Sequence, residues 1–440
     1  MGAVATPVSR SRVAIAGFIG TTIEFYDFYI YGTAAVLVFG DVFFPKFSAT
    51  AGTIASLATF GVGFVARPLG AVLFGHFGDR VGRKRMLIVS LLLMGLSTVA
   101  VGLVPGYATL GVLAPVLLTV FRFLQGIGLG GEWGGAVLLS VEYAPEGKRG
   151  LYSSFPQLGP AVGFFLSGGV FLLLTSVLST EDFRAWGWRI PFLLSAVLVV
   201  VGYYIRTTIA ETPVFRQAME RAGRARVPLF EVVRRQGGVL LLASGAMVLA
   251  HTLFYTVMTF NLSYGTTVLK LSYSAMLTCT VIAAVCLGVA TLASARLSDR
   301  LGRKRVCLSA AGVSVLWAFP MYWLMNTANP VLIAVALSGG MVIMGLFFGP
   351  MGAFLPELFA TRYRYSGASV AYSMGGIIGG AVSPILATEF YDATKSSWPI
   401  SLYLVGISVA AAVCVALLKE TYRSDLTESQ SGSRDVLGHG

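Results

Sequence analysis

The chain has 440 residues and a formal net charge of +12, and 56% of its residues are hydrophobic while only 12% are charged. Soluble domains contain about 45–50% apolar and about 25% charged residues, so this composition excludes an ordinary soluble protein. The apolar runs are about 20 residues long or longer and do not alternate within short segments, which predicts membrane-spanning helices and excludes a transmembrane β-barrel.

Twelve membrane spans are predicted in chain order, in two groups of six. The expected spans lie near residues 13–40, 52–78, 86–105, 110–140, 152–178, 189–209, 238–268, 274–297, 306–325, 329–356, 366–391 and 398–419. The longest internal gap, residues 210–237, carries six arginines and separates the two groups. We therefore expect an all-α membrane protein, divided into an N-terminal six-helix bundle (1–209), a cytoplasmic linker (210–237), a C-terminal six-helix bundle (238–419) and a cytoplasmic tail (420–440).

One short loop motif occurs twice in the sequence, at residues 75–85 between spans two and three and at 295–305 between spans eight and nine. The residues that define it are Gly75, Asp79, Arg80, Gly82 and Arg83 in the first copy and Asp299, Arg300, Gly302 and Arg303 in the second. The copies are 220 residues apart, which is half the chain. Each half is therefore expected to be one copy of a duplicated membrane domain, so that the two bundles are pseudo-symmetric.

Lysine and arginine are distributed unevenly between the two sides of the predicted membrane. If both termini lie inside, 25 of the 32 lysines and arginines are cytoplasmic and five are outside, while Arg67 and Arg122 lie at membrane depth. This bias is a strong positive-inside signal and places both termini in the cytoplasm. It also explains the high net charge without a nucleic-acid partner.

Several motifs occur together in this chain. Besides the duplicated loop, they are IEFYDF at 23–28, RPLG at 67–70, RFLQG at 122–126, GGE at 130–132, WGWRIPF at 186–192 and ETP at 211–213. Together they resemble the major facilitator superfamily and, within it, the metabolite:proton symporters. The resemblance implies two six-helix bundles around a central cavity and proton-coupled import, by alternating access, of a small organic acid or zwitterion, such as shikimate, 2-oxoglutarate, citrate, proline or betaine. We expect a monomer in the plasma membrane, with no cofactor besides the coupling proton.

Five charged residues interrupt the predicted spans of the first half. Inserting each of them into the membrane costs about 2.5–3.5 kcal/mol on insertion scales. They are Glu24, Asp27, Arg67, Arg122 and Glu132, and the second half has no charge at mid-depth. From the geometry of a helix we expect Asp27 to meet Arg122 near the midplane, and Arg67 to bridge Glu24 and Glu132 on the cytoplasmic side of it. The three acids are candidates for proton coupling. The alternative is that the lower group only locks spans one, two and four together.

Polar and aromatic side chains at similar depth are candidates for substrate contacts. Arg122 is the preferred anion ligand, because a planar guanidinium binds a carboxylate through two parallel hydrogen bonds. The candidate substrate-binding residues are Arg122, Tyr31, Gln125, Arg67, Gln157, Tyr255 and Tyr372. His251 is interpreted as a hydrogen-bonded interior histidine.

The duplicated loop has two interpretations. Its basic residues, Lys84 and Arg85 among them, can hold anionic lipid at about 1 kcal/mol per charge. That does not explain the glycines or Asp79, which can pair with a cation and cap a neighbouring helix. By resemblance, we expect both copies to clamp the cytoplasmic side in the outward-open state.

Other function classes find less support in the sequence. A channel or a sensor does not need a duplicated gating loop. The 4 cysteines and 3 histidines have no metal-ligand spacing, and a nucleophile–base set for a membrane enzyme is absent from the sequence, so we expect neither a metal site nor an enzyme. The nearest alternative is a proton-coupled drug or metabolite efflux antiporter of the same superfamily. Two arginines at membrane depth favour an anionic or zwitterionic substrate over a lipophilic cation.

Overall fold

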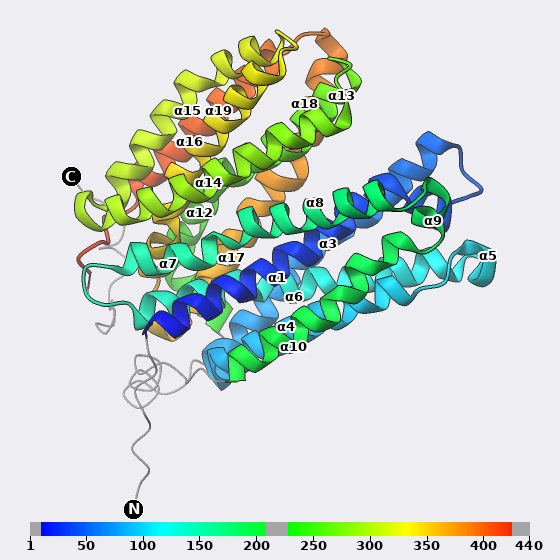
Figure 1. Cartoon of the computed structure of the whole chain (residues 1–440). Helices are drawn as coiled ribbons and strands as arrows, with labels where there is room; N and C mark the ends of the chain where they lie inside the picture. Colours follow the sequence, from blue (N-terminus) through cyan, green and yellow to red (C-terminus); the bar gives the residue numbers. More distant parts are fainter. Residues whose placement is uncertain (1–9, 208–227, 425–440) are drawn as a thin grey trace, which may run out of the picture.

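The computed structural model describes residues 10–207 and 228–424, and it confirms the predicted fold class. In the described part of the chain, 12 helical runs are long and apolar enough to cross a membrane, and they match the predicted spans in order. Figure 1 shows them as two bundles, one from each half of the sequence.

The N-terminal bundle contains spans one to six. Its helices are α1 (Arg10–Leu37), α2 (Phe39–Phe43), α3 (Ala49–Val81), α4 (Arg83–Leu103), α5 (Tyr107–Leu110), α6 (Leu113–Tyr143), α7 (Arg149–Gln157), α8 (Gly159–Val177), α9 (Thr180–Ala185), η1 (Gly187–Arg189) and α10 (Ile190–Thr207). Spans one to four are α1, α3, α4 and α6. Span five is formed by α7 and α8, which meet between Pro156 and Pro160.

The C-terminal bundle contains spans seven to twelve. Its helices are α12 (Pro228–Tyr255), η2 (Thr256–Phe260), α13 (Asn261–Thr267), α14 (Tyr273–Leu301), α15 (Arg303–Met325), α16 (Pro330–Glu357), η3 (Thr361–Tyr363), α17 (Arg364–Gly376), η4 (Ile377–Ala381), α18 (Val382–Thr394) and α19 (Trp398–Leu417). The π-helical segments η2 and η4 interrupt spans seven and eleven. Such segments often occur at functional sites, and α12 and α17 beside them line the cavity described below.

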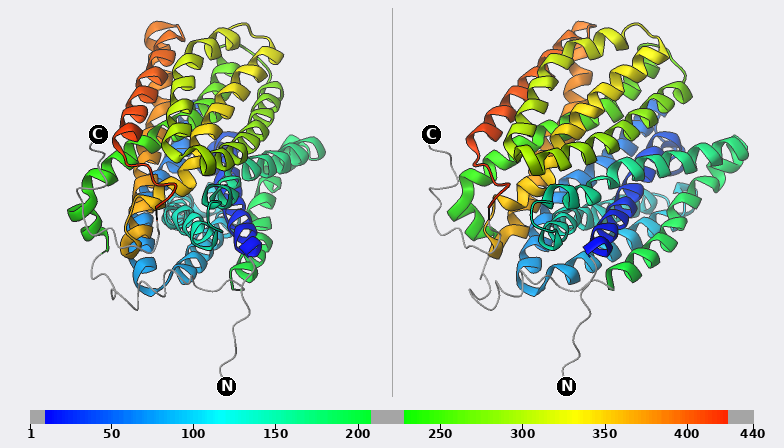
Figure 2. Two further views of the ribbon diagram at one scale, coloured as in Figure 1. Left: turned by 90° about the vertical axis from the view of Figure 1, so that its left-hand side faces the viewer. Right: turned by 60° about the vertical axis from the view of Figure 1, so that its left-hand side comes forward.

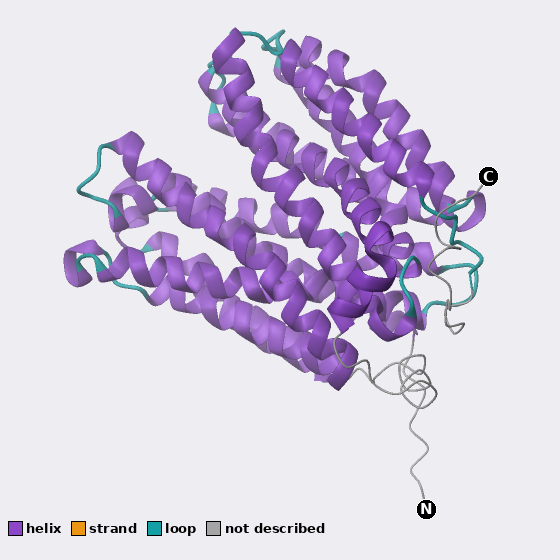
Figure 3. Cartoon of the chain, turned by 180° about the vertical axis from the view of Figure 1, so that it is seen from behind, coloured by secondary structure: helices purple, strands orange, loops and turns teal. Residues whose placement is uncertain are grey.

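The two bundles approach each other at one end and diverge at the other, as Figures 1 and 3 show. The end at which the bundles meet, where α1 begins and α19 ends, is termed the closed end, and the opposite end is termed the open end. The further views in Figure 2 show the same arrangement. Hydrogen bonds between the bundles, from α17 to α3 and from α7 to α14, lie at the closed end.

Glycine ends the second span of each bundle. Gly82 and Gly302 follow α3 and α14 with φ angles of 123° and 100°, in a region that residues with a Cβ atom rarely adopt. The next residue begins α4 or α15. Each copy of the duplicated loop is therefore a helix–glycine–helix corner, which explains why both copies keep this glycine.

Span seven begins earlier than the sequence predicts. The segment 210–237 was expected to be a linker, but α12 begins at Pro228, while 210–227 lie outside the described residues. α12 is kinked at Gln236, whose buried side-chain amide donates to the Leu358 carbonyl at 3.2 Å and accepts from the Ala360 N–H at 3.3 Å. The start of the helix is thus held by polar contacts to the loop after α16, which a hydropathy pattern does not reveal.

Glycines of α6 bring this helix into direct contact with the α3 backbone. A Cβ atom at Gly130 would lie 2.0 Å from the Arg67 carbonyl oxygen, and one at Gly126 would lie 2.3 Å from the Gly63 carbonyl oxygen. Small residues allow membrane helices to pack this closely. The close approach places Arg67 and Arg122 together in the interior of the N-terminal bundle.

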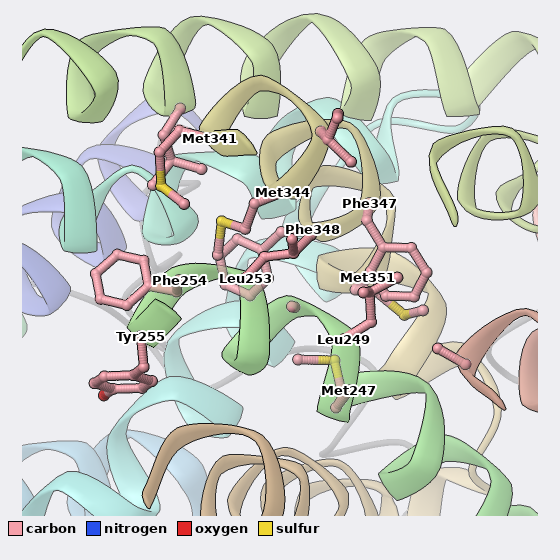
Figure 4. Packing of buried hydrophobic residues seen from close by; sticks show 14 of the residues in the cluster. Met247, Leu249, Leu253, Phe254, Tyr255, Met341, Met344, Phe347, Phe348 and Met351 are labelled. Atoms are coloured by element: carbon pink, nitrogen blue, oxygen red, sulfur yellow. The ribbon is translucent and has the colours of Figure 1, made fainter. Parts of the chain in front are cut away.

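The largest apolar core fills the C-terminal bundle and extends to the N-terminal one. Figure 4 shows its centre, where methionine and aromatic side chains of α12 and α16 interdigitate: Met247, Leu249, Leu253, Phe254, Tyr255, Met341, Met344, Phe347, Phe348 and Met351. Lipid tails are as apolar as these side chains, so the core stabilises the bundle through close van der Waals packing and not through exclusion of water.

Candidate functional site

Asp27 of α1 is buried in the N-terminal bundle, with 1% of its surface exposed. Thr98 Oγ1 on α4 donates to its carboxylate at 3.0 Å, and Ser195 Oγ on α10 donates at 2.5 Å. Each hydroxyl also has a backbone acceptor, the Met94 carbonyl for the threonine (2.9 Å) and the Pro191 carbonyl for the serine (3.4 Å). The hydroxyls can therefore serve an ionised carboxylate, or turn to the carbonyls and accept from a protonated one.

Arg122 of α6 does not pair directly with Asp27, and this corrects the prediction. The Arg122 Nη1 donates to Gln125 Oε1 at 3.1 Å, and Gln125 Nε2 donates to Thr98 Oγ1 at 2.8 Å. Thr98 then contacts Asp27. Two neutral side chains thus connect the two charges. Gln125 lies one turn after Arg122 on the same helix face, so it occupies the space through which a direct pair would form.

Three aromatic rings surround the Arg122 guanidinium. Its Cζ lies 4.6 Å from the ring centre of Phe28, 4.3 Å from that of Tyr31 and 4.5 Å from that of Phe60. Tyr31 is fixed in turn by a hydrogen bond to Thr59 at 2.8 Å. Among the described residues, nothing accepts from Arg122 Nη2. Ring faces hold the cation and leave this donor for a further ligand.

Arg67 of α3 stacks on the same phenylalanine. Its Cζ lies 4.5 Å from the ring centre of Phe28 and 4.6 Å from that of Phe64. Neither its Nε nor its Nη2 finds a hydrogen-bond acceptor in the described part of the chain. The prediction that Arg67 bridges Glu24 and Glu132 is therefore wrong. Two nitrogen atoms of this guanidinium are buried without an acceptor among the described residues.

Glu132 of α6 pairs with Arg206 of α10 instead. Arg206 donates to both carboxylate oxygens, and Ser90 of α4 donates to Oε2 at 2.9 Å. The arginine is only 4% exposed. From the sequence, Arg206 was expected among the cytoplasmic cations, because it stands in the last turn of span six.

Glu24 of α1 is 1% exposed, and its Oε2 has no hydrogen-bond partner among the described residues. The Arg206 guanidinium lies one turn away, since a Cβ atom at Gly20 would be 2.3 Å from Arg206 Nη2. The charges of Arg67 and Arg206 both act on Glu24. This acid therefore lies between two arginines without a direct ion pair to either.

The interior of the N-terminal bundle is electrically balanced. In the described part of its spans, apart from Asp79 and Arg83 in the duplicated loop and Glu142 in the ion cluster at the closed end, the buried charged residues are Glu24, Asp27, Glu132, Arg67, Arg122 and Arg206. Protonation of one acid leaves one positive charge without compensation in a low-dielectric interior, which is costly. An anionic ligand beside the arginines would restore the balance.

A narrow cavity lies between the bundles. Its lining is largely aromatic and comes from α1 and α8 on one side and from α12, α16 and α17 on the other: Phe25, Pro160, Ala250, His251, Phe254, Tyr255, Met344, Phe348 and Tyr372. Figure 4 shows Phe254, Met344 and Phe348 grouped at this place, with Tyr255 beside them. Both tyrosines that the sequence singled out are in the lining. His251 Nδ1 lies 3.0 Å from the Met247 carbonyl oxygen, in agreement with an interior histidine.

Aromatic pairs connect the bundles beside this cavity. Trp133 of α6 stacks on Tyr372 of α17, with ring centres 4.0 Å and planes 10° apart. Phe64 of α3 meets Tyr255 of α12 edge-on at 5.3 Å. Because Arg67 stacks on Phe64, it stands next to the cavity wall, and its charge acts on Tyr372.

The predicted substrate residues are therefore divided between two spaces. Asp27, Arg122 and Gln125 line a separate hollow inside the N-terminal bundle, with about 220 Å³ of empty space. Gln157 lies elsewhere and donates across the bundles to the Gly349 carbonyl at 2.9 Å. Only Tyr255 and Tyr372 of the predicted set line the inter-bundle cavity itself, with Arg67 at its edge.

At the closed end, the two copies of the loop make equivalent contacts. Asp79 accepts from the N–H groups of Tyr365 and Ser366, at 3.3 and 3.0 Å, at the start of α17. Asp299 accepts from the N–H groups of Gly150 and Leu151, at 2.7 and 2.9 Å, at the start of α7. Each aspartate thus caps a helix of the opposite bundle, where unpaired N–H groups and the helix dipole favour a negative charge.

Buried ion pairs accompany the caps. In each bundle an arginine at the start of span three or nine pairs with an acid near the end of span four or ten, and an arginine of the other bundle joins it. The two triads are Arg83, Glu142 and Arg364, and Arg303, Glu357 and Arg149. The cross-bundle distances are 3.6 Å from Arg364 to Glu142 and 3.8 Å from Arg149 to Glu357. The closed end is therefore held by two pseudo-symmetric clusters.

Other members of the predicted gating set have smaller roles in the geometry. Gly75 allows α17 to approach, because a Cβ atom there would lie 2.8 Å from Ser366 Cα. Arg80 is exposed and contacts His76 of its own helix at 3.1 Å, and Arg300 is exposed as well. The structure does not bring these two arginines into the clusters.

Several residues of the site were not predicted from the sequence. Thr98, Ser195 and Ser90 are single hydroxyls in apolar spans, and such residues usually bond their own helix backbone. The acids Glu142 and Glu357 were not predicted as site residues either, although they occupy corresponding places after the fourth and the tenth span. The pairing of acids and arginines depends on helix rotation, which sequence does not give.

Comparisons with known proteins agree with this geometry. The family model described as Major Facilitator Superfamily matches residues 17–384. The inner membrane metabolite transport protein YhjE of Escherichia coli (strain K12) is 45% identical, covering 96% of this chain and 97% of that protein. The shikimate transporter of the same organism is 37% identical, covering 95% and 96%. The structure of the proton:xylose symporter XylE bound to 6-bromo-6-deoxy-D-glucose has a TM-score of 0.77 at 16% identity, covering 97% of this chain and 98% of that one, so the two share a fold.

Proposed function

This chain belongs to the Major Facilitator Superfamily and is a membrane transporter, not an enzyme, and on that premise we propose that it imports a small organic anion or zwitterion together with a proton. The observation that carries this proposal is the balance of three acids (Glu24, Asp27 and Glu132) and three arginines (Arg67, Arg122 and Arg206) that are buried in the N-terminal bundle outside the contacts of the closed end. A proton and an anionic group that enter together keep this interior neutral, while either one alone leaves a charge uncompensated.

The substrate site in this proposal is the inter-bundle cavity with Arg67 at its edge. The cavity offers aromatic rings for the body of a small metabolite. Arg67 offers two buried N–H positions without acceptors, in a geometry suited to a carboxylate. Ligand sites of this kind combine apolar walls with a few polar groups. Arg122 is the second anion ligand, reached when the ring of Phe28, which both arginines contact, moves.

Asp27 is the proton carrier in this proposal. When it is ionised, its negative charge balances Arg122 through Thr98 and Gln125. When it is protonated, Thr98 and Ser195 turn to their carbonyl acceptors, and Arg122 loses its counter-charge. A substrate carboxylate then replaces that charge. Glu24, which has no direct partner, is the alternative carrier, and Glu132 is the least suited because Arg206 already neutralises it.

The closed end supplies the gate for alternating access. We assign it to the cytoplasmic side, because both copies of the basic loop lie there and the sequence favours termini inside. The structure then corresponds to a state whose cytoplasmic side is held shut by the two aspartate caps and the two ion clusters. Opening that side requires all of them to break together.

Competing readings receive less support. The named relatives are metabolite and shikimate transporters, which does not favour the efflux antiporter. A channel needs no alternating set of caps. We propose a monomer in the plasma membrane as the transport unit, because the two bundles that line the inter-bundle cavity belong to the same chain.

Uptake into proteoliposomes tests the proposal. Vesicles with and without an inward proton gradient are given labelled carboxylates and zwitterions, shikimate and betaine among them. We expect at least one of these substrates to accumulate with the gradient and to lose its accumulation when a protonophore is added. Accumulation that ignores both the gradient and the protonophore would remove the proton from the mechanism.

A further inference from the structure

A wide apolar groove lies on the outer face of the C-terminal bundle, between α15 and α19. It contains about 660 Å³ of empty space, and its floor is formed largely by small residues, namely Ala311 and Gly312 of α15 and Ala412 and Ala416 of α19. It is remote from the inter-bundle cavity, because none of its lining residues belongs to a helix that faces the other bundle there. The proposed transport cycle leaves it without a task.

The N-terminal bundle contains the same pair of helices, α4 and α10. In both bundles a lysine of the duplicated loop donates a hydrogen bond to a backbone carbonyl at the end of the last span. Lys84 donates to the Thr207 carbonyl at 2.7 Å, and Lys304 donates to the Ala416 carbonyl at 2.8 Å. The two helix pairs are therefore equivalent in the duplication, and one half serves as an internal reference for the other.

In the reference pair, larger side chains occupy the corresponding positions. With the offset of 220 residues, Leu91 and Leu92 of α4 stand where Ala311 and Gly312 stand in α15. Leu91 is 1% exposed and packs into the gap at Gly202 of α10. In contrast, a Cβ atom at Gly312 would meet no atom within 4 Å. In the second half, alanine and glycine therefore occupy the positions at which leucine side chains stand in the first half.

Cationic side chains surround the closed-end mouth of the groove. Lys304 reaches Ala416 there, and Arg305 and Lys419 beside it are both exposed. The nearest acid, Glu420, is already engaged, because its carboxylate accepts from the first two N–H groups of α15 at 2.9 and 3.0 Å. Among the described residues, Arg305 and Lys419 form no ion pair with an acid. The groove therefore combines an apolar floor with a positive mouth.

We propose that this groove binds a phospholipid with an anionic headgroup, with one acyl chain between α15 and α19 and the headgroup against Arg305 and Lys419. An empty groove in the hydrocarbon region would forfeit the van der Waals contacts that hold membrane helices together, and an acyl chain restores them. The positive mouth selects the headgroup, since juxtamembrane cations attract anionic lipid. A second copy of the chain fits less well, because a two-fold contact would place one groove against another and fill neither.

The test compares phosphatidylglycerol with phosphatidylcholine of identical acyl chains on the purified full chain in detergent. Native mass spectrometry counts the retained lipids, and thermal unfolding measures their effect on Tm. We expect phosphatidylglycerol to be retained preferentially and to raise Tm more. Arg305→Gln with Lys419→Gln should lower this preference about fivefold per charge, which corresponds to about 1 kcal/mol each. The control is Lys270→Gln, at an exposed lysine between α13 and α14 at the open end, which should leave the preference unchanged.

Filling the groove tests its apolar half. Gly312→Leu restores the reference pattern and should abolish retention of the lipid, while Gly169→Leu, at an exposed glycine of α8 that also has no atom within reach of a Cβ, should not. Equal retention of the two lipids by the unaltered chain would overturn the proposal, as would retention that survives Gly312→Leu. A dimer that dissociates in Gly312→Leu, without headgroup preference, would assign the groove to a second copy instead. If Gly312→Leu does not fold, the proposal is tested by the lipid preference of Arg305→Gln with Lys419→Gln alone.

Discussion

Phe28 is the residue that connects the two halves of the coupling site. It follows Asp27 directly in α1, and its ring is in contact with the guanidinium groups of both Arg67 and Arg122. One arginine stands beside the inter-bundle cavity and the other is linked to the buried aspartate. A change at either arginine can therefore reach the other through the ring of Phe28, and the two arginines are expected to have different roles.

The different roles can be separated by lysine substitution, which keeps the charge but loses the planar fork. Arg67→Lys should weaken substrate binding by about tenfold, the loss of one good charge-assisted contact, with the pH dependence of transport unchanged. Arg122→Lys should change the pH dependence of transport and should weaken substrate binding less than Arg67→Lys does. Binding by isothermal calorimetry and uptake at several pH values give both quantities. The reverse pattern would exchange the two assignments.

Thr98 tests the relay between Asp27 and Arg122. Thr98→Val keeps the shape but removes the hydroxyl that contacts both Asp27 and Gln125, while Thr98→Ser keeps it. A hydrogen bond to a charged group is worth about 1.5–3 kcal/mol. Thr98→Val should therefore slow proton-driven uptake by about ten- to a hundredfold, and Thr98→Ser should remain close to the unaltered protein. If the valine variant transports normally, the relay is not part of the coupling.

At the scale of helices, the contact between α3 and α6 sets the positions of both arginines. Gly130→Ala would place a Cβ atom 2.0 Å from the Arg67 carbonyl oxygen and must push the helices apart. Overpacking of this kind typically costs about 1–3 kcal/mol. We expect a lower Tm together with impaired transport. Gly169→Ala, at an exposed position of α8, is the control that should leave both unchanged, and a Gly130→Ala variant that behaves like it would contradict the packing account.

The sequence predicted the helices more reliably than their rotation. Long apolar runs marked all twelve spans, because a helix in lipid needs about 20 apolar residues to cross the hydrocarbon core. Helix faces placed Asp27 and Arg122 in the same layer, but the pairing depended on which side chains fill the gap, and Gln125 and Thr98 do so. Arg206 was missed because a cation in the last turn of a span resembles a cytoplasmic one until its burial is known.

At the scale of the whole molecule, the duplication appears as two equivalent clamps at the closed end. The repeated loop predicted that both copies would have one role, and the structure places both aspartates at the N-termini of helices in the opposite bundle. The partners α17 and α7 could not be predicted from the loops themselves. They belong to other spans, and only the packing of the bundles brings them together.

The clamps predict a shift between conformations. A charge at a helix N-terminus is worth up to about 2 kcal/mol in buried geometry. Asp79→Asn and Asp299→Asn should each raise the population that is open at the closed end by about ten- to thirtyfold. Spin labels at the exposed positions Lys148 and Arg300, one in each bundle, report this as a longer distance. Asp41→Asn, an exposed acid with an exposed partner, is the control. An unchanged distance distribution in both loop variants would argue against the clamps.

The central claim is that protonation of Asp27 couples the proton to the substrate, and Asp27→Asn tests it most directly. Asparagine mimics the protonated acid and cannot release the proton. In one set of vesicles, substrate exchange without a gradient is measured beside proton-driven accumulation. The account predicts that Asp27→Asn exchanges substrate, with little dependence on pH, and does not concentrate it. Accumulation by Asp27→Asn equal to that of the unaltered protein would contradict the account and pass the role to Glu24 or Glu132.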